Sequence, residues 1–190
     1  MQVHHIVLIA LALLLLYAVL IYNGLINLKN SLRQAWSNID VLLKQRHDEL
    51  PKLVETCKQY MQFEQSTLEK VMNARAAQQQ ARTRTDVAAV GAAEAAVRSG
   101  LGSINATAEA YPELRASQPL QQLLHRISNL EGSISDRREL YNEYVNTYNV
   151  RIAQFHSLMI ARPFGFTVAA LLQFSSAETA DVDLRALFRT

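Results

Sequence analysis

Few side chains in this sequence have the chemistry of catalysis, and they are scattered along the chain. The five histidines are His4, His5, His47, His125 and His156. His47 is the strongest candidate for proton transfer, because Arg46 and Glu49 flank it in the segment QRHDELP. The alternative is a polar cluster that caps a helix break ahead of Pro51, and this is the interpretation we favour.

The common catalytic and cofactor-binding patterns are absent from the sequence. It contains no HExxH, GxGxxG, Walker, GxSxG or paired-cysteine motif. Cys57 is the single cysteine, so it can form no intrachain disulfide, and its apolar position predicts a buried thiol rather than a reactive one. We therefore predict that the protein is not an enzyme and holds no cofactor and no metal.

A second group of side chains could act through packing instead. Three of them precede Pro51, and three lie in a tyrosine-rich stretch about a hundred residues later. We predict that they meet in a buried polar layer that fixes the register of two helices. The alternative is a ligand pocket. The residues of this polar layer are Trp36, Asp40, Arg46, Tyr144, Tyr148 and Asn149.

The first element that must position these residues is an apolar N-terminal run. Every residue from Ile6 to Tyr22 is apolar or aromatic, and as a helix the run covers roughly 25 Å, close to the core of a bilayer. A cleaved signal peptide is the alternative, but no Lys or Arg precedes the run and no small-residue cleavage site follows it. We predict a single-pass transmembrane helix over residues 6–26, with Leu13 and Leu16 among its anchor residues.

The basic residues around this helix predict its orientation. Lys29, Arg33, Lys44 and Arg46 follow the apolar run, and none precedes it. The positive-inside rule then places the body in the cytoplasm and leaves residues 1–5 as a periplasmic stub.

The body, residues 27–161, has the spacing of long amphipathic helices. Apolar residues recur every three or four positions from Leu25 to Val71, which predicts one helix, or two in line, with a kink or short break between His47 and Pro51. The polar stretch from Ala76 to Thr85 is expected to be a connection or a frayed helix end. Glycine and proline are sparse, with 6 and 4 residues, which favours helices over sheets.

Two further helices are expected after this connection. Asp86 can cap an Ala-rich helix that ends near Tyr111, and the longest regular pattern runs from Leu120 to Phe155. We therefore predict an all-α fold in which the transmembrane helix continues into an antiparallel bundle of long helices.

The C-terminal tail, residues 162–190, is too apolar for an ordinary disordered terminus. The segment TVAALLQF in it could form a short helix or strand. We expect the tail to cover its own bundle, a neighbouring subunit or the membrane interface, and so to act in assembly. The aromatic residues predicted to do this are Phe164, Phe166, Phe174 and Phe188.

Three long motifs resemble the LemA family of bacterial membrane proteins. The matching segments are Tyr22–Arg75, AYPELRASQ at 110–118 and YNEYVNTYNVRIAQFHSLMIA at 141–161. The resemblance implies an anchored antiparallel bundle in the bacterial inner membrane. A relative linked to the formation of membrane compartments suggests, by analogy, a role in organising membranes. The chain departs from the family pattern at His156, where proline is usual, and in the tail after Phe166.

These observations favour a scaffold that binds membrane lipid, self-assembles as a homo-oligomer and organises or shapes the membrane. The alternative is a membrane-tethered adaptor or signalling module that couples a membrane event to a cytoplasmic partner such as a protease. Nucleic acid is not an expected partner, because the 19 basic residues are nearly balanced by 17 acidic ones.

Overall fold

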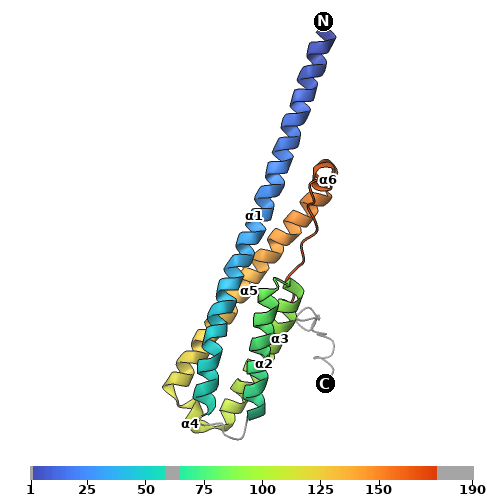
Figure 1. The fold of residues 1–190 in the computed structure, drawn as a ribbon. Helices are drawn as coiled ribbons and strands as arrows, with labels where there is room; N and C mark the ends of the chain where they lie inside the picture. The colour runs from blue at the N-terminus through green and yellow to red at the C-terminus, as the bar shows by residue number, and fades with distance from the viewer. Residues whose placement is uncertain (1, 59–64, 175–190) are drawn as a thin grey trace, which may run out of the picture. The chain divides into compact units, whose positions relative to one another are not determined.

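A computed structural model of the chain describes residues 2–58 and 65–174, and these residues form six helices and no strand. The helices are α1 (Gln2–Lys58), α2 (Gln65–Thr83), α3 (Val87–Ala110), α4 (Pro112–Arg115), α5 (Gln118–Ala153) and α6 (Phe155–Ala161) (Figure 1). The predicted all-α fold is confirmed, including the continuation of the apolar N-terminal run into the body as one helix.

Helix α1 is 57 residues long and passes through Pro51. We predicted a kink or a short break between His47 and Pro51, and the break does not form, so His47 does not cap one. Proline has no backbone N–H, so the carbonyl of His47, four residues earlier, loses its helical donor. The side chain of Arg75 replaces that donor, because its Nε donates to the His47 carbonyl oxygen at 2.9 Å. The replacement comes from another helix, so local sequence could not reveal it.

The described residues divide into two compact units. Unit 1 consists of residues 2–42 and 133–171, and it contains the N-terminal part of α1, the C-terminal part of α5 and all of α6. Its core is formed by Ile21, Leu25, Tyr148, Ile152 and Ala161. From Gln2 to Tyr17 every residue of α1 is exposed within this unit.

Unit 2 consists of residues 43–58, 65–132 and 172–174. Helices α2 and α3 lie side by side in it as a helical hairpin (Figure 1). Thr85 makes the turn with a φ of 53°, and Asp86 caps α3 by accepting a hydrogen bond from the Ala89 amide at 3.0 Å. The cap confirms the prediction at Asp86. The polar stretch from Ala76 is helical as far as Thr83, so it is the end of α2 and not a connection.

The core of unit 2 brings together residues from α1, α2, α3 and α5. It includes Leu50, Leu53, Cys57, Leu68, Val71, Val97, Leu101, Ile104, Leu120 and Ile127. Beyond α6 the chain turns at Gly165 and has no regular secondary structure from Phe166 to Phe174. The short helix or strand expected over TVAALLQF does not form.

Candidate functional site

A buried ionic cluster connects three helices of unit 2. Arg46 on α1 is completely buried, as is Glu94 on α3. The guanidinium Nη1 donates to Oε1 of Glu94 at 2.6 Å, and Nη2 donates to Oε2 of the same carboxylate. Gln78 on α2 donates its Nε2 to Glu94 Oε2 at 2.6 Å. This two-pronged pair is the strongest geometry open to arginine and a carboxylate.

Two further charged groups surround the pair. Arg46 Nη1 lies 3.9 Å from Oε1 of Glu131, and Arg98 Nε lies 3.4 Å from Oε1 of Glu94. Burial raises the pKa of the Glu131 carboxyl above its ordinary value, although the positive charges of Arg46 and Arg98 oppose part of that rise. The cluster therefore combines two carboxyl groups with two guanidinium groups, so its charges nearly balance.

The burial of the ionic cluster indicates a role in holding the fold and not in catalysis. Arg46 and Glu94 have no exposed surface, so neither presents a reactive atom to a substrate. A buried pair of this kind fixes which residues of α1 and α3 face each other, because any other register would leave a charge unpaired. Among the residues that the structure describes, no group of three or more His, Cys, Asp or Glu side chains is arranged to hold a metal.

His47 and Cys57 are both withdrawn from solvent. Burial lowers the pKa of the His47 imidazole, and the charge of Arg75 lowers it further. Both effects favour the neutral form of the half-buried His47 side chain. Burial raises the pKa of the Cys57 thiol to about 11, so very little thiolate exists at neutral pH.

Unit 1 has an aromatic cluster where the apolar run of α1 ends. The ring of Tyr22 lies 4.9 Å from that of Phe164 and 5.9 Å from that of Phe166, centroid to centroid. The ring of Tyr17, five residues earlier on α1, lies 6.1 Å from the His156 ring on α6, centroid to centroid. Tyrosine is common at the two surfaces of a bilayer because its ring is apolar and its hydroxyl is polar.

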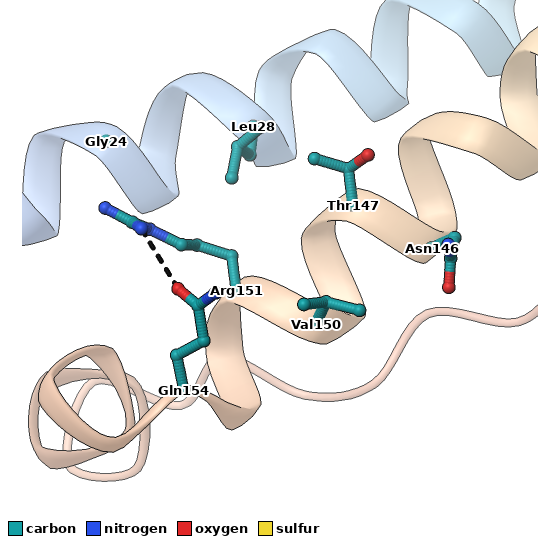
Figure 2. A pocket seen from close by; sticks show the side chains of 7 residues that line it. All are labelled: Gly24, Leu28, Asn146, Thr147, Val150, Arg151 and Gln154. Atoms are coloured by element: carbon teal, nitrogen blue, oxygen red, sulfur yellow. Dashed lines mark hydrogen bonds between the residues drawn. The ribbon is translucent and has the colours of Figure 1, made fainter.

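A groove lies between α1 and α5 of unit 1 (Figure 2). It is lined by Gly24, Leu28, Asn146, Thr147, Val150, Arg151 and Gln154. The side chain of Arg151 extends toward α1 at Gly24, and its Nη1 donates to Oε1 of Gln154 at 3.0 Å (Figure 2). The apolar run ends at Tyr22, so the positive charge of Arg151 lies near α1 two residues beyond that end.

The segment after α6 is hydrogen-bonded to α5 through two side chains of that helix, Tyr141 and Asn149. The side chain of Asn149 forms two hydrogen bonds with the backbone of Ala169, donating through Nδ2 and accepting at Oδ1, both at 2.9 Å. The hydroxyl of Tyr141 donates to the carbonyl of Ala170 at 3.1 Å. Burial raises the pKa of the Tyr141 hydroxyl, so it remains a donor at physiological pH. These bonds replace the strand or helix that the segment lacks.

The predicted polar layer is divided between the two units. Arg46 belongs to unit 2 and the other five residues belong to unit 1, so the grouping as one layer stays a prediction. Trp36 contacts α5 through Tyr141, with ring centroids 5.6 Å apart. Asp40 and Tyr144 are half-buried, and Tyr148 is buried in the apolar core.

The predicted assembly residues have different surroundings. Phe164 is exposed, and Phe166 is half-buried in the core of unit 1. Phe174 is buried in unit 2, where the Arg98 guanidinium carbon lies 4.9 Å from its ring centroid, so it is not an exposed assembly surface. Phe188 lies outside the described residues.

Sequence reasoning missed the central acceptor of the ionic cluster, Glu94. One signal could have found it, because Glu94 stands alone among small apolar residues in VAAVGAAEAAV. A lone carboxylate on the packing face of a helix requires a buried cation. Gln78 gave no comparable signal, since it is one of three consecutive glutamines.

These features describe an all-helical protein with one helix, α1, that is long and apolar enough to cross a membrane among the residues described. The sequence profile of the LemA family matches residues 35–185, most of the chain, and the chain belongs to this family. It is 28% identical over 161 residues to a protein named Protein LemA from Metamycoplasma hominis, covering 85% of this chain and 73% of that relative. The predicted family resemblance is confirmed.

Proposed function

We propose that this chain is a non-enzymatic, single-pass membrane protein that self-assembles into a scaffold on the bacterial inner membrane. The observation that carries the membrane anchor in this proposal is the exposed apolar surface of α1. Residues such as Leu8, Leu14 and Leu15 are each about 60% exposed, and no part of unit 1 covers them. A continuous apolar surface of this length is unstable in water and marks a contact with lipid or protein.

The charge distribution supports a cytoplasmic body. Lys29 and Arg33 follow the apolar run directly and are exposed on α1. Cytoplasmic sides of membrane helices are rich in such residues, so the helical body that follows the span, from residue 27 onward, would lie in the cytoplasm.

Membrane extraction tests the anchor. The full-length protein, expressed in a bacterium, is expected to stay in the membrane pellet after washing with alkaline carbonate and to enter solution only with detergent. Protease added to intact spheroplasts should leave unit 2 uncut, whereas the same protease should digest it in inverted vesicles. An intact chain in the soluble fraction would overturn the anchor, and digestion in spheroplasts would reverse the orientation.

Light scattering tests self-assembly. The protein extracted in mild detergent is expected to elute from a sizing column as particles several-fold heavier than one chain. A strictly monomeric particle across a wide range of concentrations would refute the scaffold. If that monomer brought down a second protein in fixed stoichiometry, the adaptor function would explain the anchored units instead.

A further inference from the structure

Helix α6 has one covered face and one uncovered apolar face. Ser157 and Ala161, four residues apart, are buried in unit 1. Phe155 and Met159, also four residues apart and on another side of the helix, are 74% and 68% exposed. Phe164 in the following turn is 62% exposed. Three large apolar side chains are thus exposed within ten residues.

These side chains lie at a defined level along α1. His156, next to Phe155, contacts Tyr17, and Phe164 contacts Tyr22. Tyr17 and Tyr22 are the first and the last of the final six residues of the apolar run, so α6 and the turn after it lie beside about the last 8 Å of that run, at 1.5 Å per residue. If α1 spans a bilayer, α6 lies at the boundary between acyl chains and headgroups.

Three basic side chains lie near these apolar residues in unit 1. Lys29, Arg151 and Arg162 are all exposed. The ammonium of Lys29 lies 5.6 Å from the centroid of Phe166, and Arg151 extends to α1 at Gly24 (Figure 2). Apolar residues bordered by Lys and Arg are typical of helices in the interface, where the cations meet anionic headgroups.

We propose that α6 and the turn after it form a second membrane contact, in which Phe155, Met159 and Phe164 enter the cytoplasmic leaflet, at the end of the apolar run of α1. The partner is the lipid of that leaflet, with acyl chains against the apolar face and anionic phosphates against Lys29, Arg151 and Arg162. This inference rests on the proposed membrane anchor. It adds that the part of unit 1 outside the span contacts the bilayer through α6 as well as being joined to it through α1.

Spin-label depth measurements test the contact in the full-length protein. Three variants carry one introduced cysteine each: Met159→Cys on α6, Leu11→Cys in the apolar run and Val41→Cys on α1. Val41 is the matched control, because it is an exposed apolar residue of unit 1 that lies 19 residues beyond Tyr22 on the same helix. The unmodified protein is the labelling blank, since its Cys57 is buried. Labelled proteins are placed in nanodiscs of phosphatidylethanolamine and phosphatidylglycerol.

The ratio of accessibility to oxygen over accessibility to a water-soluble nickel complex reports depth. For Met159→Cys this ratio should be several-fold higher than for Val41→Cys and lower than for Leu11→Cys. A ratio equal to that of Val41→Cys, with Leu11→Cys still deep, would overturn the contact and leave the anchor intact. Low accessibility to both reagents at Met159→Cys would also overturn it, because protein would then cover α6. A shallow Leu11→Cys would remove the anchor itself.

Discussion

At Arg46 the guanidinium has lost its hydration water, and the resulting free energy cost is offset only by its partners. Glu94 supplies both carboxylate oxygens, and Gln78 donates to one of these oxygens as well. A buried pair contributes little beyond what apolar side chains would, yet breaking it is costly because one charge stays behind. The cluster therefore specifies the arrangement of α1, α2 and α3 more than it stabilises it.

Removing the Glu94 carboxylate should reveal the free energy cost of leaving the Arg46 charge buried and unpaired. Glu94→Ala leaves Arg46 buried without its carboxylate, and we expect a loss of about 3 to 5 kcal/mol in the free energy of unfolding. Urea titration of the detergent-solubilised protein, followed by circular dichroism, measures it. Glu109→Ala is the control, because Glu109 is exposed on the same helix. Equal stability of the two variants would mean that the pair does not hold the helices together.

The second carboxylate of the cluster should make stability depend on pH. Because burial raises the pKa of Glu131 above 4.5, the folded protein binds this proton more tightly than the unfolded chain does. This proton's contribution to the free energy of unfolding is complete below pH 4.5, and it is lost as the pH rises through the raised pKa of Glu131. Glu131→Gln removes this loss, so its stability relative to the unmodified protein should increase with pH above 4.5. Urea titrations at a series of pH values would show a flat difference if Glu131 titrated normally.

At the scale of elements, the glycines of α3 differ sharply in what surrounds them. A Cβ on Gly91 would lie 2.0 Å from the carbonyl oxygen of Gln173, whereas a Cβ on Gly102 would meet nothing within 4 Å. Gly91 therefore allows the segment that carries Phe174 to lie directly on the helix. Gly102 has no such role and only weakens the helix.

Alanine at these two positions should have opposite effects. Gly91→Ala must displace the Gln173 backbone and with it buried Phe174, and we expect a loss of about 1 to 3 kcal/mol. Gly102→Ala should stabilise α3 by about 0.5 to 1 kcal/mol. Thermal unfolding of both variants gives the comparison. Stabilisation by Gly91→Ala would show that the segment does not pack against α3 in solution.

The sequence predicted elements well where their signals were local. Apolar spacing and the Asp86 cap identified α3, and the long stripe from Leu120 identified α5. The error at Pro51 has a distant cause, because the donor that preserves α1 is the side chain of Arg75. The hydrogen bonds of Asn149 to the backbone of Ala169 are also tertiary, and they hold a segment that has no periodic pattern in the sequence. Local patterns cannot indicate such tertiary hydrogen bonds.

At the scale of the whole molecule, α1 contributes to both units and also carries the apolar run. The family match begins at residue 35, beyond that run, so it supports the helical body and says nothing of the anchor. The exposed apolar surface from Ile6 onward is the separate evidence for the anchor.

One charge in the middle of this run should weaken membrane binding. Leu13→Arg places a guanidinium near the centre of the span, which costs about 2.5 to 3.5 kcal/mol for insertion. A larger share of the chain should then be released by carbonate. Val41→Arg, on the same helix beyond the run, should remain in the pellet like the unmodified protein. Identical extraction of both variants would indicate that the run does not cross lipid.

The sequence has one cysteine, Cys57, and it is buried, so chemical labelling of its thiol reports local unfolding of the protein. Cys57 lies in the core of unit 2, and its thiol has a pKa of about 11. Maleimide or a disulfide dye should therefore react with the native chain only when α1 separates from its neighbours in that unit. The labelling rate, measured in intact membranes without any substitution, would follow local unfolding there and would rise first in variants that loosen the helices around Arg46.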